Sequence, residues 1–152
     1  MEKKFILTDE FVINGFGVKL FRIKCIKSFK YANEGELGGL IEKEENLEQS
    51  GNAWVYGDAQ VYGNAWVSGD ARVYGDAKIE NNDSHCGFDC FGSANRHTHA
   101  YLTNDNKVEI TCGCFKGSIE EFEKKVEETH SGTVYEKQYK AIIDVIKIKF
   151  GL

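Results

Sequence analysis

The sequence lacks the features of secreted and membrane proteins. No apolar run is long enough to cross a bilayer, and the first residues, MEKKFILTDE, become polar too early for a signal peptide. Proline is absent as well. We therefore expect a cytoplasmic protein with no membrane partner. The length of 152 residues predicts one compact unit or two small ones.

Two further absences argue against whole classes of nucleotide and nucleic-acid proteins. Neither glycine-rich phosphate-binding motif, G-x4-G-K-[ST] or G-x-G-x-x-G, occurs where a strand would lead into a helix. The net charge is −5 and the isoelectric point is about 5.4, whereas general nucleic-acid binding favours a basic surface. Phosphate-loop chemistry is therefore excluded, and nucleic acid is not an expected partner.

The strongest positive signal is a six-residue repeat, GNAWVY-GDAQVY-GNAWVS-GDARVY-GDAKIE, over residues 51–80. Each hexad holds an alanine and, two residues later, a valine or isoleucine, and residues two apart on a strand face the same way. The residue between them varies freely, Trp54 and Trp66 included, which is typical of an outward position. Each hexad turns at Gly-Asp or Gly-Asn, residues that tolerate positive φ. A short fixed period of this kind is typical of a solenoid.

This pattern resembles the hexapeptide-repeat family, the left-handed parallel β-helix. The resemblance implies that three hexads make one triangular coil, so that Tyr56 lies over Tyr74 and Trp54 over Arg72. It covers roughly residues 37–80 and implies about two to three coils. Short members of the family commonly self-associate, so the resemblance also implies a homo-oligomer, with a trimer favoured.

We expect three parts along the chain. Residues 1–36 are interpreted as an N-terminal β cap, residues 37–80 as the β-helix and residues 81–152 as a C-terminal α+β unit. The cap would cover the open edge of the first coil. The expected fold class is therefore mainly β with C-terminal helices, organised around a short left-handed parallel β-helix.

The last part of the chain predicts a β-hairpin followed by two helices. Tyr101–Thr103 and Val108–Cys112 are expected to be the strands of the hairpin. The capping box Ser118-Ile119-Glu120-Glu121 starts a helix that is expected to end near Gly132. An apolar face then predicts a second helix from about Val134 to Lys149.

Two longer phrases resemble uncharacterised proteins of bacteria and bacteriophages. The first is LGGLIEKEENL at residues 37–47, followed by the hexads. The second is CGCFKGSIEEFEKKVEETH, followed by YEKQYKAI, which resembles a tail of phage and prophage proteins of unknown function. Both resemblances imply an origin in a mobile element, and neither assigns any chemistry.

Cysteines and histidines gather in the C-terminal part. The five cysteines are an odd number and accompany no secretory signal, which indicates a reducing compartment and thiols that are free or bound to metal. Two close cysteine pairs, with His85, His97 and His99 nearby, form a candidate zinc site, since zinc takes four such ligands. These candidates are Cys86, Cys90, Cys112, Cys114, His97 and His99. Alternatively, the cysteines are small buried hydrophobes and the two histidines share a solvated strand face. No cofactor other than zinc is expected.

A catalytic thiol is another interpretation of the same residues. Cys114 lies a few residues before the expected helix, and a helix N-terminus lowers the pKa of a thiol. His97, His99 or His130 would be the partner base. The sequence alone places none of these histidines beside the thiol.

Acyl transfer is the activity that the hexapeptide-repeat resemblance implies. Enzymes of that family have many coils, a histidine base and a long loop that projects from a coil. This chain has no histidine between residues 1 and 84 and no such loop. These departures put both acyl-CoA binding and the catalytic base in doubt.

Outward aromatic and basic side chains are the candidate binding residues, because tryptophan and tyrosine are enriched at interfaces. They are Trp54, Tyr56, Trp66, Arg72, Tyr74 and Arg96. The same rings can instead form a solvent-facing ladder that stabilises neighbouring coils.

The function expected from these features is that of a non-catalytic, oligomeric binding protein of phage or prophage type. It would inhibit a host-defence protein or sequester a small, nucleotide-like ligand, in the host-cell cytoplasm if the chain is encoded by a phage. Two alternatives stay open. One is a hexapeptide-repeat acyltransferase, and the other is a structural or assembly module with a zinc-stabilised C-terminal unit.

Overall fold

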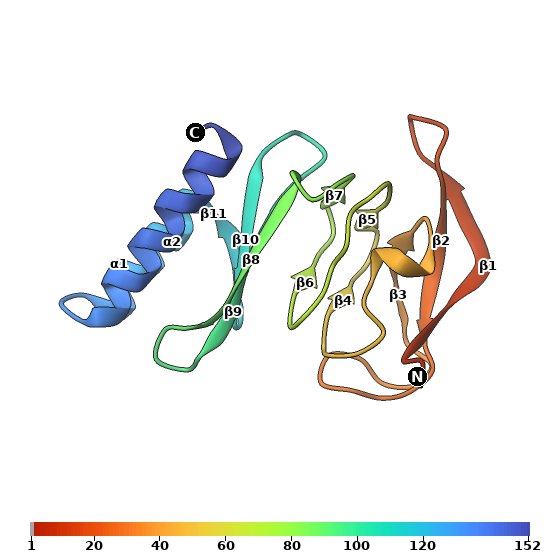
Figure 1. Cartoon of the computed structure of the whole chain (residues 1–152), viewed down its shortest axis with the longest axis horizontal. Coiled ribbons are helices and arrows are strands. Elements are labelled where there is room, and N and C mark those ends of the chain that lie inside the picture. Colours follow the sequence, from red (N-terminus) through yellow and green to blue (C-terminus); the bar gives the residue numbers. More distant parts are fainter. Residues whose placement is uncertain (1) are drawn as a thin grey trace. The chain divides into compact units, whose positions relative to one another are not determined.

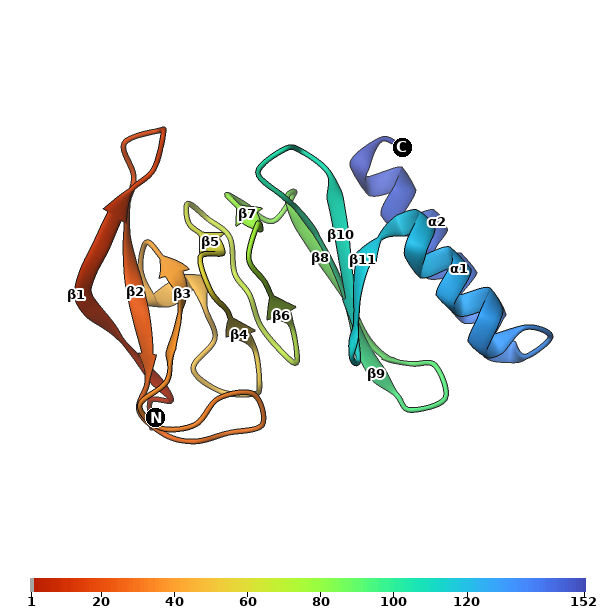
Figure 2. The ribbon, with the colours of Figure 1, turned by 180° about the vertical axis from the view of Figure 1, so that it is seen from behind.

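The computed structural model describes residues 2–152 and divides the chain into two compact units (Figures 1 and 2). The first unit ends at Ser84, and the second comprises His85–Leu152. The N-terminal strands therefore belong to the same unit as the hexads. Within residues 2–152, no helix is both long and apolar enough to cross a membrane.

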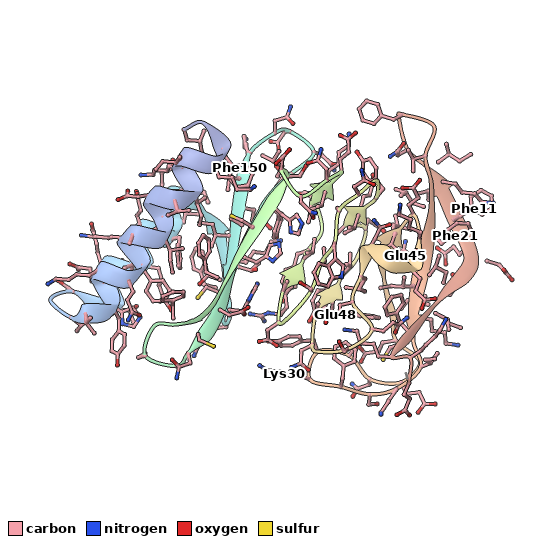
Figure 3. All side chains as sticks on the ribbon, viewed as in Figure 1. Phe11, Phe21, Lys30, Glu45, Glu48 and Phe150 are labelled. Carbon is pink, nitrogen blue, oxygen red and sulfur yellow. The ribbon has the colours of Figure 1, made fainter. Side chains whose placement is uncertain are left out.

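The first unit is built on two sheets. Its strands are β1 (Phe5–Ile13), β2 (Lys19–Cys25), β3 (Leu37–Ile41), β4 (Trp54–Val55), β5 (Gln60–Val61), β6 (Arg72–Val73) and β7 (Lys78–Ile79), and a 3-10 helix spans Glu44–Asn46. The five-stranded sheet has the order β1-β2-β3-β5-β7 and the second sheet pairs β4 with β6. On β1 and β2, the rings of Phe11 and Phe21 pack at a centroid distance of 6.2 Å (Figure 3).

The hexads stack three repeats apart, as the resemblance to the hexapeptide-repeat family implies. Gln60 lies opposite Lys78 in a parallel register, and the rings of Tyr56 and Tyr74 stack 4.4 Å apart at 3°. The alanine and the β-branched residue of every hexad are at most 2% exposed. At the turns the glycines have positive φ. At Gly63 (φ 62°) a Cβ would also overlap the backbone oxygen of Glu80. The stacking step and the inward face are therefore confirmed.

The predicted fold class, a mainly β protein with C-terminal helices organised around a short left-handed parallel β-helix, is wrong. The structure is a mixed α/β protein, with sheets of five, four and two strands and two C-terminal helices. The reason lies at β3, which is antiparallel to β2 on one side and parallel to β5 on the other. The N-terminal strands and the repeats thus share one mixed sheet. A six-residue period specifies a local strand and turn, but it does not specify which strand pairs with the first repeat.

The N-terminal residues also explain why Trp54 does not face solvent. The residue is 1% exposed, and its ring lies edge-on to Phe5 and Phe29 at centroid distances of 6.3 and 5.4 Å. Trp66 holds the same place in its own hexad and is 53% exposed. The predicted outward position is therefore wrong for Trp54, because segments that precede the hexads cover it.

The second unit is a four-stranded antiparallel sheet with two helices on one face (Figures 1 and 2). Its elements are β8 (His85–Phe91), β9 (Arg96–Leu102), β10 (Val108–Cys112), β11 (Phe115–Ser118), α1 (Ile119–His130) and α2 (Val134–Phe150). The sheet order is β11-β10-β9-β8. Both predicted helices are confirmed. The predicted hairpin is only the middle of the sheet, because β8 and β11 flank it.

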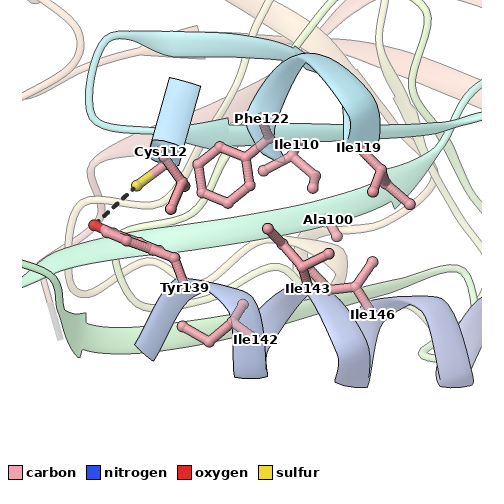
Figure 4. Close-up of a cluster of buried hydrophobic side chains, with 10 residues drawn as sticks. Ala100, Ile110, Cys112, Ile119, Phe122, Tyr139, Ile142, Ile143 and Ile146 are labelled. Atoms are coloured by element: carbon pink, nitrogen blue, oxygen red, sulfur yellow. Dashed lines mark hydrogen bonds between the residues drawn. The ribbon is translucent and has the colours of Figure 1, made fainter. Parts of the chain in front are cut away.

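The helices cover the sheet through a shared apolar core (Figure 4). Its buried side chains include Ala100 and Ile110 from the sheet, Phe122 from α1 and Ile143 and Ile146 from α2. Ser118 closes the start of α1, since its hydroxyl accepts a hydrogen bond from Glu121 N at 3.1 Å and the Glu121 carboxylate accepts one from Ser118 N at 2.7 Å. This reciprocal pair is the predicted capping box.

Candidate functional site

The second unit contains a pocket of about 280 Å³. It is lined by the loop between β8 and β9, the turn between β10 and β11, and both helices. Its floor is formed by side chains that are buried in the core, Cys112, Phe122, Val126 and Tyr139. Exposed polar residues, Ser93 and Thr129 among them, also line the pocket. The hollow is therefore apolar inside and polar toward solvent.

Two glycines give this pocket its shape. Gly92 (φ 77°) and Gly113 (φ 57°) have left-handed backbone conformations that favour glycine. A Cβ at Gly92 would overlap the Tyr139 hydroxyl, and a Cβ at Gly113 would overlap the guanidinium of Arg96. Gly92 N also donates a hydrogen bond to Gln138 Oε1 at 2.9 Å, which ties the β8–β9 loop to α2. Both turns thus leave their backbone bare so that a large side chain can lie against it.

The pocket carries positive charge in an acidic protein. Arg96, Lys125 and His130 line it, and its described lining residues include no aspartate or glutamate. Arg96 and Lys125 are exposed and so lie toward solvent. The imidazole of His130 is held by Tyr139, on which it stacks at 5.5 Å, and by Tyr135, which it meets edge-on at 5.8 Å. Because the whole chain has 24 acidic and 19 basic residues, this lining differs in sign from the chain as a whole.

Two of the predicted zinc ligands also line the pocket. Cys112 is buried, and the Thr98 hydroxyl donates a hydrogen bond to its Sγ at 3.3 Å. The same Sγ lies 3.6 Å from the Tyr139 hydroxyl (Figure 4). Burial and the contact with Cys112 raise the pKa of Tyr139, so its phenol stays protonated at neutral pH. Cys114 is exposed at the β10–β11 turn.

The other two cysteines lie elsewhere. Cys86 packs against the core beneath the helices, whereas Cys90 is exposed on β8 at a residue with a φ of 65°. Among residues 2–152, no three histidine, cysteine, aspartate or glutamate side chains are placed to hold one metal ion. The structure therefore does not gather the predicted ligands into one group, and zinc binding stays a prediction from the sequence.

A row of hydrogen-bonded imidazoles lies on β8 and β9. His97 Nδ1 contacts the carboxylate of Asp89, His97 Nε2 lies 3.4 Å from His99 Nδ1, and His99 Nε2 lies 3.1 Å from His85 Nδ1. His99 is 2% exposed, so the alternative that it shares a solvated face with His97 is wrong. Burial lowers the pKa of His85 to about 4 and the pKa of His99 well below its usual value. The sequence shows the His97-x-His99 spacing, but it does not show that β8 brings His85 beside them.

The aromatic side chains of the first unit form a ladder. Tyr56 stacks on Tyr74, and both are half-buried. The guanidinium of Arg72 lies 5.0 Å over the ring of Tyr31 and donates a hydrogen bond to the Tyr74 hydroxyl at 3.5 Å. Burial raises the pKa of Tyr56. These contacts favour the stabilising ladder over a surface held open for a partner.

The six predicted binding residues do not form one site. Trp54 is buried, and Arg96 belongs to the second unit and lines its pocket. Trp66 lines a different and shallow hollow with acidic and polar residues of the segment 44–50. Sequence reasoning found Arg96 but missed Lys125, Phe122 and the two glycines, because no spacing in the sequence connects them.

No protein-family model matches this chain, and no curated protein matches it. Its function is therefore inferred from the chemistry of the described residues. The pocket of the second unit is the site where apolar, cationic and conformationally special residues come together.

Proposed function

We propose that the protein is a non-catalytic binding protein that sequesters a small ligand in the pocket of its second unit. The observation that carries this proposal is the pocket itself, with its buried floor and its basic, exposed lining. Concave, mostly apolar sites with a few placed polar groups are the usual form of small-molecule sites. Gly92 and Gly113 shape the pocket, because their turns adopt a positive φ and leave no room for a Cβ.

The surroundings of Cys112 support binding over nucleophilic chemistry at this thiol, whereas Cys114, the nucleophile predicted from the sequence, is exposed and lines the same pocket as His130, and its catalytic role stays a prediction. A catalytic thiol needs a neighbouring base to take its proton. The Sγ of Cys112 instead accepts a hydrogen bond from the Thr98 hydroxyl and lies beside the protonated phenol of Tyr139. Neither hydroxyl is a base at neutral pH, so these contacts fix the thiol as part of the pocket floor.

The same proposal includes a homo-oligomer, with a trimer favoured, that acts in the cytoplasm. It also includes a bacteriophage or prophage type of protein that removes a ligand from a host-defence response. The oligomer and the origin rest on the resemblances of the repeat and of the two longer phrases, and the cytoplasmic location rests on the lack of a signal-peptide pattern in the sequence. The pocket adds a place where a ligand would be held.

Native mass spectrometry of gently purified protein tests the proposal. We expect wild-type protein made in a bacterial host to carry a small bound mass. Thr129→Trp should lose that mass, because Thr129 is exposed on α1 and lines the pocket, so that an indole there fills the entrance. Val134→Trp is the matched control, since Val134 is exposed at the start of α2 and lies outside the pocket. Wild-type protein without any bound mass, or equal masses on both variants, would contradict sequestration at this site.

A further inference from the structure

We infer that the ligand of this pocket is an organic anion with an apolar body, whose charged group lies at Arg96 and Lys125 and whose body packs against the aromatic floor. This inference rests on the proposed function and names the chemical class of the ligand. Carboxylates, sulfonates and phosphate monoesters share this chemistry. A nucleotide belongs to the class when its base is the part that enters the pocket.

The charges that line the pocket select the sign of the ligand. Arg96, Lys125 and His130 contribute basic groups, and no aspartate or glutamate is among the described residues that line it. A guanidinium offers a planar fork of donors that matches a carboxylate or phosphate, and an ammonium adds a compact positive charge. A cationic ligand would find no counter-charge in this lining, and a neutral one would leave the cations unused.

The position of Arg96 is fixed by the backbone beneath it. The guanidinium occupies the space that a side chain at residue 113 would fill, and only glycine leaves that space open. The charge of Arg96 also acts on the hydroxyl of Tyr139, whose pKa it lowers against the larger effect of burial. Its guanidinium therefore belongs to the pocket, although the residue as a whole is exposed.

The floor of the pocket selects the body of the ligand. The rings of Phe115 and Phe122 lie 5.1 Å apart at 39°, and Phe122 meets Tyr139 edge-on at 5.5 Å. An inorganic anion would leave these aromatic surfaces against water, whereas an apolar body would release that water. The volume of about 280 Å³ lies just below the usual range of small-molecule sites, which favours a compact body of no more than about three rings.

A pair of fluorescent probes separates charge from shape. The first is 8-anilinonaphthalene-1-sulfonate, and the second is N-phenyl-1-naphthylamine, which has the same rings without the sulfonate. We expect wild-type protein to bind the sulfonate saturably and about tenfold more tightly than the neutral amine. Thr129→Trp should abolish saturable binding of both probes, and Val134→Trp should change neither.

Removal of one cation tests where the anionic group lies. Arg96→Gln should weaken the sulfonate about tenfold and leave the neutral amine unchanged. Lys125→Gln is a second variant at an exposed position and should act in the same direction. Lys137→Gln is the charge-matched control, because Lys137 is exposed on α2 and does not line the pocket. Circular dichroism at the helix bands checks that every variant is folded.

The possible results distinguish the ligand class from the proposed function. Equal affinity for both probes, with no effect of Arg96→Gln or Lys125→Gln, would overturn the anionic class while binding in the pocket stands. Inorganic sulfate that displaces the sulfonate probe at matching concentration would overturn the apolar body. If neither probe binds saturably, the ligand class is overturned, and native protein without bound mass then overturns the proposed function as well.

Discussion

The two units of this protein build their cores in different ways. In the first unit the same pair of small and β-branched side chains returns every six residues, so each repeat packs on a copy of itself. In the second unit unlike side chains from four strands and two helices meet, and the helices and turns enclose a pocket. A periodic core is simple to specify, because the same pair of inward side chains returns in every repeat. An irregular core brings together residues that no period connects, and a specific site depends on such residues.

The two tryptophans offer the largest test of this comparison, because they hold equivalent places in the repeat. Trp54→Ala should lower the free energy of unfolding of the first unit by about 3–5 kcal/mol, since it removes a buried ring packed on Phe5 and Phe29. Trp66→Ala should change it by no more than about 0.5 kcal/mol, because Trp66 is 53% exposed. Each variant keeps the other tryptophan as a fluorescent probe of denaturant unfolding. Equal effects would mean that the N-terminal segments do not cover Trp54.

The second unit should lose more stability in acid than the first unit, because residues 1–84 contain no histidine. Burial lowers the pKa of His85 to about 4, below its unfolded value, so the unfolded chain binds the proton first as the pH falls. The stability that neutral His85 contributes is fully present above about pH 6.5 and is lost as the pH falls toward 4. The total loss in the free energy of unfolding is about 3 kcal/mol. His99 acts in the same direction.

Helix circular dichroism follows the second unit during this titration, and tryptophan fluorescence follows the first. We expect the midpoint of helix unfolding in urea to fall between pH 6.5 and 4 by more than the fluorescence midpoint does. His85→Gln should reduce that difference, because it removes one of the two buried titrating imidazoles. A helix midpoint that does not fall between pH 6.5 and 4 would contradict the buried, neutral state of these histidines.

The same contrast explains what could be foreseen from the sequence. The spacing of the strands follows from the period, and the family resemblance adds that every third hexad stacks, as Gln60 does on Lys78. The start of α1 follows from the capping box of Ser118 and Glu121. Both are local, since the determining residues are adjacent or regularly spaced. The burial of Trp54 depends on Phe5, far away in sequence, and the period carries no information about it. The fold class was wrong for the same reason, because the period does not specify the antiparallel neighbours of β3.

The pocket shows most clearly what the sequence alone could not predict. Arg96 and Cys112 lie on the paired strands β9 and β10, and the packing of α2 on the sheet brings Tyr139 to them. Arg96 and Cys112 were both singled out from the sequence, but for two different sites. The sequence shows a glycine after Cys112, but the close approach of that glycine to Arg96 is seen only in the structure.

Gly113→Ala should have a moderate effect on stability and a specific effect on binding. Gly132→Ala is the matched control in the same unit, since Gly132 also has a positive φ, of 78°, but has open space around it. Both changes should destabilise the second unit by about 1 kcal/mol through backbone strain. Only Gly113→Ala should also weaken the sulfonate probe, because the new methyl group displaces Arg96. Equal probe affinity for the two variants would show that Arg96 does not depend on the bare backbone.

The smallest expected effect concerns the cap of α1. Ser118→Ala removes the hydroxyl that accepts from Glu121 N at 3.1 Å, which should cost the second unit about 1 kcal/mol or less. Thr133→Ala at the start of α2 should cost about as much, because the Thr133 hydroxyl accepts from Glu136 N at 3.4 Å and donates to His130 O at 2.7 Å. Neither change should move the fluorescence transition of the first unit, whose turns depend on glycine and not on helix caps. A fluorescence shift as large as the helix shift would show that the two units unfold together. The two cores would then share one unfolding transition, and their stabilities could not be measured separately.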